Sequence, residues 1–236
     1  MFTNEVAKFI TNSMKIELHS IVDKLNEVEL KEFKTDLIKL VECCVSELIS
    51  HEPHRVEPVM CLSKQNSAEE AINKYALELT ASIGDNDKVN EVIDTLRHSF
   101  SCFAYNGLHQ LYTRQENERW HPRVVLTEIL EPNDIETLDE TVILYRGCDV
   151  AEYESKNFGQ AWSTSKERAT DFAYRHYASQ PWFNSKNRIV LKAIYPRDKV
   201  LFSDQSIEFE VVVDPKHLVN VDECKTIGTP TILSKP

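Results

Sequence analysis

The sequence lacks the segments that direct proteins into or across membranes. Its 236 residues contain no apolar stretch that approaches the roughly 18 residues of a membrane-spanning helix. The first residues, MFTNE, also lack the basic and apolar regions of a secretory signal peptide. We therefore expect a soluble, cytoplasmic protein that does not engage a membrane.

The cysteines lack the spacing of a redox motif. Six cysteines occur, but none forms a C-x-x-C pair, and a chain of this length buries a core without disulfide bonds. This usage favours a reducing compartment. His51, His54 and Cys61 of HEPHRVEPVMC could be arranged around a metal, but two prolines and irregular spacing favour a loop between helices. We expect no metal cofactor.

Basic residues are scarce relative to acidic ones, although only in part of the chain. With 27 lysines and arginines against 38 aspartates and glutamates, the net charge of -11 does not attract phosphate backbones. Residues 1–140 hold 14 basic and 26 acidic side chains, whereas residues 141–236 hold 13 and 12. Either solvated helix faces or a surface that docks a basic, neutralising partner explains this acidic excess.

The N-terminal part has the periodicity of helices. From Val6 to about Ser50, apolar residues recur at intervals of three and four, which predicts amphipathic helix. NSAEEAINKYALELTASIG predicts a second helix that ends at Gly84, and DNDKVNEVIDTLRHSFSCFAYNGLHQLYTRQ predicts a third. The sequence contains no internal repeat or low-complexity tract. We assign residues 1–110 to a helical N-terminal region.

After Pro132 the pattern changes from helical to strand-like. Five short runs rich in β-branched and aromatic residues predict strands: TVILYRG, IVLKAIYP, KVLF, IEFEVVVDP and HLVNV. One helix, KERATDFAYRHYA, interrupts them. The chain is therefore predicted to be α+β, with residues 111–236 forming a β-rich core beside the helical region.

The run ILYRG places an arginine and a glycine at the end of an apolar strand. The guanidinium of Arg146 cannot lose its charge, and its planar fork matches a phosphate or a ribose of a dinucleotide. Gly147 would let a ligand approach the backbone closely. Taken alone, an apolar strand that ends in arginine is more often explained by a surface ion pair.

Three hydroxyl residues lie between a short strand and the helix in WSTSKERATDFA. Thr164 followed by Glu167 is typical of a capping box, so helix capping explains that hydroxyl. Capping leaves Ser163 and Ser165 unassigned. Ser163, on the strand side, is placed to hold a neighbouring carboxylate by a hydrogen bond.

Two glutamates occur in SIEFEVVVDP, a run that otherwise resembles a buried strand. At strand spacing Glu208 and Glu210 point to the same face, where desolvation and mutual repulsion both disfavour ionisation. The ordinary explanation is the polar face of an edge strand. Such a pair also suits cleavage of a glycosidic bond, because one carboxylate stabilises an oxocarbenium-like transition state while the other steers the nucleophile.

In this order, YRG, the three hydroxyl residues and E-F-E resemble the R-S-E signature of the arginine-type mono-ADP-ribosyltransferase superfamily. The resemblance covers roughly Thr141 to Val221. This part of the chain is similar to bacterial exoenzymes and phage-encoded transferases. It implies a split β-sandwich core of ADP-ribosyltransferase type, with NAD⁺ as co-substrate. The first 110 residues resemble no family.

The resemblance also implies which residues bind NAD⁺. They are Arg146 for the phosphate and ribose, Gly147 for the nicotinamide amide, and Ser163, Thr164 and Glu210 around the nicotinamide ribose. The catalytic set would be Arg146, Ser163, Glu210 and the upstream glutamate. In this family Ser163 orients the catalytic Glu210, which stabilises the oxocarbenium ion.

The acceptor is a macromolecule of open identity. Glu208, on a turn at about residues 203–207, would engage the nucleophile, and a glutamate there accompanies arginine as acceptor. Phe172, Trp182 and Phe183 compete to stack on the nicotinamide. A basic cluster favours instead transfer to RNA or DNA by a toxin of phage defence or of a toxin–antitoxin system. Its members are Lys166, Arg168, Arg175, Lys186, Arg188 and Lys192.

Further alternatives remain beside transfer. The acidic helical region would in the toxin case bind an antitoxin or another regulator. NAD⁺ glycohydrolysis, with water as acceptor, requires the same centre. A non-enzymatic binding module is the third possibility, and the presence of all three signature residues argues against it.

Overall fold

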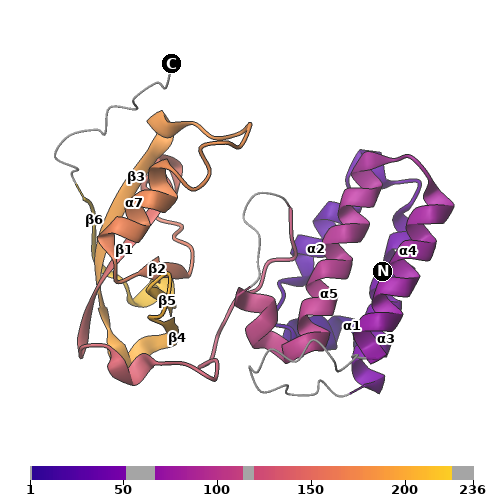
Figure 1. Cartoon of the computed structure of the whole chain (residues 1–236), viewed down its shortest axis with the longest axis horizontal. Coiled ribbons are helices and arrows are strands. Elements are labelled where there is room, and N and C mark those ends of the chain that lie inside the picture. The colour runs from indigo at the N-terminus through magenta and orange to yellow at the C-terminus, as the bar shows by residue number, and fades with distance from the viewer. Residues whose placement is uncertain (1, 52–66, 114–119, 225–236) are drawn as a thin grey trace. The chain divides into compact units, whose positions relative to one another are not determined.

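The computed structural model describes residues 2–51, 67–113 and 120–224 and divides the chain into two compact units (Figure 1). The first unit, Met1–Val125, is helical, and the second, Leu126–Pro236, contains an antiparallel sheet. The protein is therefore α+β, as the sequence predicts. The division expected between residues 110 and 111 falls inside a helix that continues to Thr113.

The helical unit contains five α-helices and two shorter helical turns within the described residues. They are α1 (Asn4–Lys8), the π-helical turn η1 (Phe9–Ser13), α2 (Leu18–Leu25), the 3-10 turn η2 (Val28–Leu30), α3 (Lys34–Ser50), α4 (Ser67–Ile83) and α5 (Asp87–Thr113). Among the residues that the structure describes, no helix is both long and apolar enough to cross a membrane.

The amphipathic pattern expected from Val6 to Ser50 is divided among several helices. Lys15 adopts a φ of +53°, and Ile16 forms an isolated antiparallel bridge with Val124, so helix does not continue between η1 and α2. The apolar periodicity persists across this break because both sides bury side chains in the same unit. α4 ends at Ile83 before Gly84, whose φ of +75° a glycine adopts without strain.

The largest fully buried side chains of the helical unit are apolar. They are Phe100, Ile10, Met14, Ile16, Ile21, Leu25, Leu30, Leu37, Leu40 and Ile72. His54 and Cys61, which the sequence offered as metal ligands, lie outside the described residues. Within the described ranges no group of three or more histidine, cysteine, aspartate or glutamate side chains could hold a metal ion.

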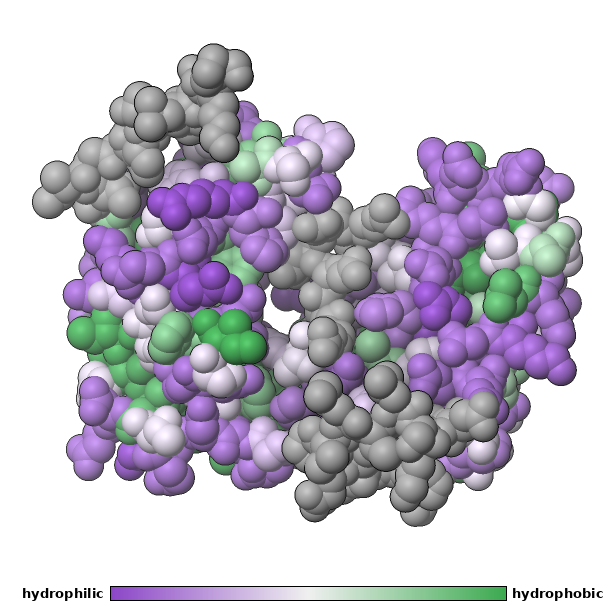
Figure 2. Space-filling view, in the orientation of Figure 1, coloured by the Kyte–Doolittle hydropathy of each residue, from purple (hydrophilic) through white to green (hydrophobic). Residues whose placement is uncertain are grey.

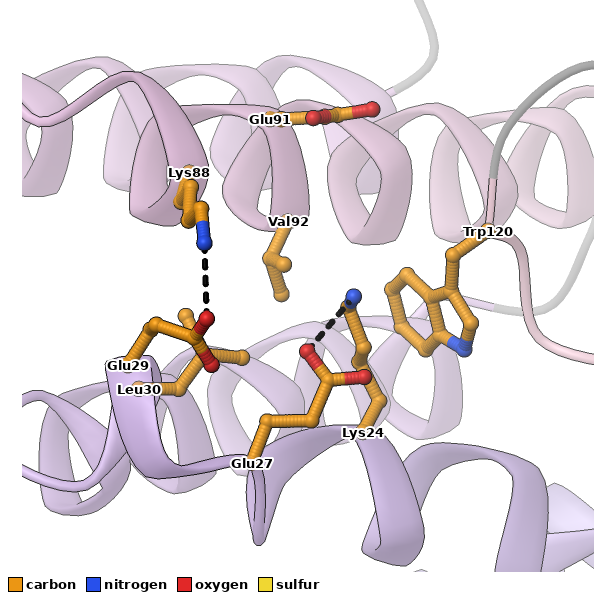
Figure 3. A pocket seen from close by; sticks show the side chains of 8 residues that line it. All are labelled: Lys24, Glu27, Glu29, Leu30, Lys88, Glu91, Val92 and Trp120. Carbon is orange, nitrogen blue, oxygen red and sulfur yellow. Dashed lines mark hydrogen bonds and ion pairs between the residues drawn. The ribbon is translucent and has the colours of Figure 1, made fainter. Parts of the chain in front are cut away.

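A cavity of about 160 Å³ lies in the helical unit beside α5 (Figure 3). Its wall is formed by Lys24, Glu27, Glu29, Leu30, Lys88, Glu91, Val92 and Trp120. Lys24 pairs with Glu27 at 2.8 Å and lies 5.7 Å from the centre of the Trp120 ring, while Lys88 pairs with Glu29 at 2.7 Å. The charges that line this cavity are thus largely neutralised within it.

Each of the five runs predicted as strands contributes to the sheet of the second unit. The strands are β1 (Thr141–Asp149), β2 (Ala161–Ser163), β3 (Arg188–Pro196), β4 (Val200–Asp204), β5 (Glu210–Val213) and β6 (Val219–Glu223). The helical elements are η3 (Ile135–Thr137), α6 (Val150–Ser155), α7 (Lys166–Tyr174), η4 (Ser185–Asn187), η5 (Arg197–Lys199) and η6 (Pro215–His217).

The sheet consists of two strand groups with a narrow connection. Its order is β4-β5-β2-β1-β3-β6, and all neighbours are antiparallel. β1 and β3 pair along their whole length, from Thr141↔Pro196 to Asp149↔Arg188. By contrast, β1 and β2 are joined by a single register pair, Tyr145↔Ser163. The groups β4-β5-β2 and β1-β3-β6 therefore meet at one residue pair.

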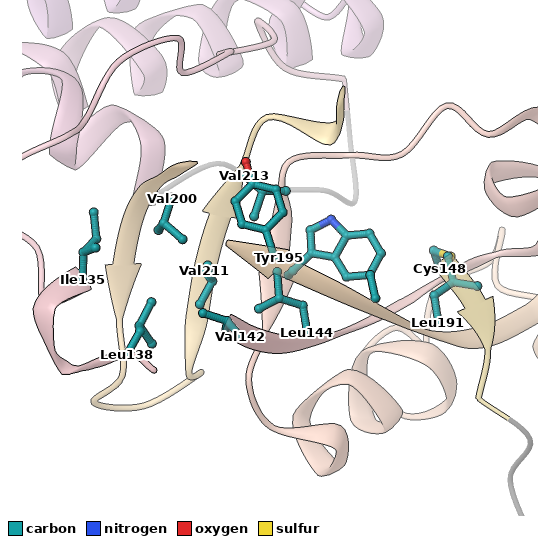
Figure 4. Packing of buried hydrophobic residues seen from close by; sticks show 12 residues of the cluster. Ile135, Leu138, Val142, Leu144, Cys148, Leu191, Tyr195, Val200, Val211 and Val213 are labelled. Atoms are coloured by element: carbon teal, nitrogen blue, oxygen red, sulfur yellow. The ribbon is translucent and has the colours of Figure 1, made fainter. Parts of the chain in front are cut away.

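One hydrophobic cluster is shared by both strand groups (Figure 4). Its members are Ile135, Leu138, Val142, Leu144, Cys148, Trp162, Leu191, Ala193, Tyr195, Val200, Val211 and Val213. Tyr195 is fully buried, and its hydroxyl bonds to the carbonyl oxygens of Lys199 and Asp214 at 3.0 and 3.2 Å. This hydroxyl ties β3 to the chain segments that precede β4 and follow β5.

Candidate active site

The three signature residues lie on three neighbouring strands. Ser163 of β2 pairs directly with Glu210 of β5, and on its other side with Tyr145 of β1, which precedes Arg146. Because paired residues of a sheet share a face, Ser163 and Glu210 lie on the same side. Arg146 follows Val142 and Leu144 at strand spacing, so its side chain leaves β1 on the opposite side from that of Tyr145.

The guanidinium of Arg146 lies in the gap between β1 and β2. If the β1–β2 ladder continued past Tyr145↔Ser163, Gly147 would pair with Ala161. Instead, Nη1 of Arg146 donates to the Ala161 carbonyl oxygen at 2.5 Å. The arginine thus binds backbone two residues from Ser163, at the connection of the two strand groups.

A carboxylate that the sequence analysis did not identify holds this arginine. Oε1 and Oε2 of Glu152, on α6, accept from Nε and Nη2 of Arg146 at 2.5 and 3.0 Å, and Oε1 also accepts from the Gly159 amide at 3.1 Å. The two side chains are only 21% and 20% exposed. A Cβ on Gly159 would lie 2.4 Å from Nη2, so a side chain there would displace the guanidinium from this position. The bidentate pair fixes one orientation of Arg146.

Gly147 has a different role from the one expected. A Cβ at this position would lie 2.1 Å from the Ala169 carbonyl oxygen and 2.5 Å from the Ala173 amide nitrogen. The space next to the glycine is therefore occupied by the backbone of α7, which packs directly on β1. The sequence analysis expected Gly147 to leave room for a ligand. On the side where a Cβ would lie, this expectation is wrong, because α7 fills the space.

Ser163 bonds to backbone rather than to a carboxylate. Its side chain is buried, with the residue 6% exposed, and its hydroxyl donates to the Glu208 carbonyl oxygen at 2.9 Å while accepting from the Ser165 amide at 3.1 Å. A hydroxyl has one hydrogen to donate, so Ser163 does not also donate to the carboxylate of Glu210 in this arrangement. It holds the chain segment just before that glutamate.

Ser165, not Thr164, caps α7. The Ser165 hydroxyl accepts from the Arg168 amide at 3.2 Å, so the predicted cap is one residue too early. Thr164 instead donates from Oγ1 to Oε1 of Gln205 at 2.6 Å and from its amide to the Phe209 carbonyl at 2.9 Å. The side chain and backbone of Thr164 thus anchor residues 205–209, which we name the β4–β5 turn.

The two glutamates do not share a strand face, contrary to the prediction. β5 begins at Glu210, and Phe209 before it adopts a φ of +54°, which interrupts the alternation of a strand. Glu208 belongs to the β4–β5 turn, where its side chain is 47% exposed and its Oε1 lies 3.2 Å from Nη2 of Arg168. A left-handed backbone at phenylalanine costs about 1–2 kcal/mol, and such strain is concentrated at functional sites.

Glu210 combines a half-buried carboxyl group with a fixed backbone. Gln205 donates from Nε2 to the Glu210 carbonyl at 3.1 Å, and the β5–β2 ladder holds its main chain. Burial first, and then the negative charges of Glu208 and Asp204, together raise the pKa of Glu210 from 4.5 to about 7. A carboxyl group with this pKa can accept or release a proton near neutral pH.

The three aromatic candidates belong to one array of rings. Phe172, on α7, lies 4.7 Å from the ring of His176, and the guanidinium carbon of Arg168 lies 5.7 Å from its centre. Trp182 is 48% exposed and lies 6.3 Å from Phe183. This arrangement does not single out one ring to stack on nicotinamide.

The comparisons with known proteins returned no relative. No family model matches the sequence, and neither the curated proteins nor the solved structures include a match. The function of the chain is therefore inferred from the chemistry of the site described above.

Proposed function

We propose that residues 126–224 form a split β-sandwich of ADP-ribosyltransferase type. Two features of the sheet support this fold: the strand groups β4-β5-β2 and β1-β3-β6 meet at the single pair Tyr145↔Ser163, and both groups contribute to one hydrophobic cluster. Two antiparallel layers that share a core behave as a sandwich. In this fold the dinucleotide would bind at the junction of the layers.

The proposed activity is cleavage of NAD⁺ and transfer of ADP-ribose to a macromolecule. The observation that carries it is the pairing of Ser163 with Glu210 across β2 and β5. Arg146 leaves the neighbouring strand β1 on the opposite face, and its guanidinium binds the Ala161 carbonyl of β2. Cleavage breaks the bond between the ribose C1′ and the nicotinamide nitrogen, and nicotinamide leaves as a neutral molecule. The catalytic requirement is therefore negative charge beside C1′ rather than a strong general acid.

Glu210 would supply that negative charge. Its raised pKa means that both protonation states are populated near pH 7 in the free protein. The positive nicotinamide ring of bound NAD⁺ would favour the ionised carboxylate, because an opposite charge nearby lowers the pKa of an acid. Substrate binding would thus convert Glu210 into the form that stabilises an oxocarbenium ion.

Arg146 would contribute orientation. Glu152 and the Ala161 carbonyl hold its guanidinium in one position, and about one fifth of the side chain, 21%, stays exposed. A pre-oriented donor loses little freedom when it binds a phosphate or ribose oxygen, so it contributes more affinity than a mobile one. NAD⁺ binding at Arg146 would compete in part with the charge of Glu152.

The acceptor that we propose is a protein arginine. The exposed carboxylate of Glu208 already binds one guanidinium, that of Arg168, at 3.2 Å. An incoming arginine would bind in the same manner, its nitrogen would attack C1′, and the proton it loses would pass to a carboxylate or to water. Glu208→Gln should therefore spare NAD⁺ hydrolysis and abolish transfer to arginine.

Incubation of the full chain with radiolabelled NAD⁺ and separated protein, RNA and DNA fractions tests the proposal. We expect label in the protein fraction, and in Glu210→Gln a loss of NAD⁺ cleavage of about 100-fold or more, with an unchanged circular dichroism spectrum. Arg146→Ala should chiefly raise the KM for NAD⁺. Glu223→Gln, an exposed glutamate of β6, is the matched control.

Three results would contradict the proposal in different ways. Absence of NAD⁺ consumption by the wild type, or equal rates in Glu210→Gln and wild type, would exclude the activity. Label found only in RNA or DNA would keep the reaction and replace the acceptor. NAD⁺ consumption without label in any fraction would identify a glycohydrolase.

A further inference from the structure

One short segment of the sheet unit has a positive net charge, opposite in sign to the net charge of the whole chain. Residues 166–192 contain six lysines and arginines but only two acidic residues, Glu167 and Asp171, whereas the whole chain has a net charge of -11. The segment comprises α7, the loop that follows it and most of β3. A polyanion would therefore meet local attraction here against a general background of repulsion.

The same segment carries a continuous array of aromatic rings. Ring centres are separated by 4.7 Å between Phe172 and His176, 4.6 Å between His176 and Tyr177, 5.4 Å between Tyr177 and Trp182, and 6.3 Å between Trp182 and Phe183. Tyr177 is 8% exposed and anchors the array, whereas Trp182 is 48% exposed. The array thus presents a supported indole ring to solvent.

The loop that carries these rings is shaped by its own hydrogen bonds. Residues 175–187, the orange loop between α7 and β3 in Figure 1, contain successive turns closed by Ala178→Arg175, Gln180→Tyr177 and Phe183→Gln180 amide-to-carbonyl bonds. We name it the α7–β3 loop. Both of its ends are tied together, because Arg188 donates to the Ala173 carbonyl at 3.3 Å and accepts at its own carbonyl from the Tyr174 hydroxyl at 3.2 Å.

The basic residues of the segment divide into structural and available charges. Arg188 holds the end of α7, and Arg175 pairs with Asp171 at 2.8 Å. Lys186 and Lys192 are exposed, and Lys186, in η4, follows Phe183 by three residues in the sequence. A charge at Lys186 would therefore lie close to the exposed end of the ring array.

We propose that the α7–β3 loop binds single-stranded nucleic acid, with a base stacked on Trp182 and a phosphate paired with Lys186. Proteins bind single strands by combining aromatic rings, on which unpaired bases stack, with positive charges that follow the backbone. The bases of a duplex are already stacked on one another, so an exposed ring favours the single strand. An acidic protein would use the charges but gain little from the indole face.

The loop also connects to the proposed active site through one residue. Arg168 lies over the Phe172 ring at 5.7 Å and pairs with Glu208 of the β4–β5 turn at 3.2 Å. A strand bound along the rings would thus end near the acceptor side of the site. The binding itself requires neither NAD⁺ nor catalysis.

Fluorescence anisotropy with labelled single strands of about 12 nucleotides, as RNA and as DNA, tests the proposal on the full chain. We expect a Kd of about 10⁻⁶–10⁻⁴ M that weakens steeply between about 50 and 200 mM salt. Trp182→Ala should weaken binding about tenfold or more, whereas Lys186→Gln should weaken it less and lower the salt dependence by roughly one phosphate contact. Lys199→Gln, an exposed lysine of η5 in the same unit, is the control and should bind as the wild type does.

Several outcomes would overturn the proposal. They are absence of binding to both RNA and DNA, equal binding by Trp182→Ala and wild type with the same circular dichroism spectrum, and equal affinity for a duplex or for polyglutamate. A preference between the RNA and DNA strands identifies which of the two the loop accepts. Because no NAD⁺ is present, failure here leaves the proposed transferase activity intact, and failure of that activity leaves this binding intact.

Discussion

The helical unit and the sheet unit differ in which polar side chains they bury and in how these are bonded. In the helical unit the largest buried side chains are apolar. Its buried serines are Ser99, which donates within its own helix to the Thr95 carbonyl at 3.0 Å, and Ser101, which donates to Asn73 of α4 at 3.4 Å. In the sheet unit the Arg146–Glu152 pair is four-fifths buried, and Ser163 connects two separate chain segments. Figure 2 shows that hydrophilic side chains predominate on the outer face drawn there.

This difference indicates where chemistry is to be sought. Burial of a charged or ionisable group costs free energy unless hydrogen bonds offset the loss of water. The largest buried side chains of the helical unit are apolar and carry no such cost. The sheet unit retains it at Glu210 and at Arg146, which is the pattern expected of a unit selected for function.

The largest expected difference between the two units is the loss of unfolding free energy when one glycine of each unit is replaced by alanine. Gly147→Ala would push a Cβ into the backbone of α7, and we expect a loss of at least about 3 kcal/mol of unfolding free energy. Gly84→Ala, directly after α4 with a φ of +75° and no atom within 4 Å of the added Cβ, should cost only about 1–2 kcal/mol. Urea denaturation measures both. Equal losses would show that α7 can shift away from β1 at little cost.

The pH dependence of stability tests the buried acid. Because the folded-state pKa of Glu210 is about 7 and the reference value is 4.5, the folded protein binds more protons than the unfolded chain between these values. Stability should therefore fall as pH rises from about 4.5 to 7, by up to about 3 kcal/mol. Glu210→Gln, which has no such proton, should lack this decrease. Parallel pH profiles of wild type and variant would contradict the raised pKa.

Two ion pairs extend the comparison to smaller effects. Glu152→Gln leaves the largely buried Arg146 without its charged partner, and we expect a loss of about 1–2 kcal/mol. Asp94→Asn removes a helical-unit pair whose carboxylate side chain is 63% exposed, and it should cost less than about 0.5 kcal/mol. Thermal unfolding separates the two. A larger effect at Asp94 would reverse our assignment of the costly polar groups to the sheet unit.

The sequence alone predicts elements well where one periodicity dominates. The alternation in TVILYRG and the β-branched composition of IVLKAIYP predict β1 and β3, because each is a long strand with one buried face. The helices of the first unit follow from apolar residues at three and four. Their breaks do not, since the bridge between Ile16 and Val124 joins residues far apart in the chain.

The arrangement of the candidate site residues was predicted less completely, because it depends on single backbone conformations and on contacts between distant residues. The left-handed φ of Phe209 removes Glu208 from the strand, and phenylalanine gives no warning of such a conformation. Thr164 and Ser165 are equally good caps by residue type, so the choice depends on Gln205 drawing Thr164 to the turn. Glu152 belongs to no recognisable sequence motif. It reaches Arg146 because α6, which carries it, directly follows β1.

The anchors of the β4–β5 turn leave its tip unconstrained. Gln205 and Phe209 are bonded to Thr164, and Ser163 holds the carbonyl of Glu208, whereas Ile207 between them is 74% exposed. Insertions are tolerated best at exposed tips whose flanks are fixed. A short peptide inserted at Ile207 should therefore be displayed on the surface while Gln205 and Phe209 keep their bonds to Thr164.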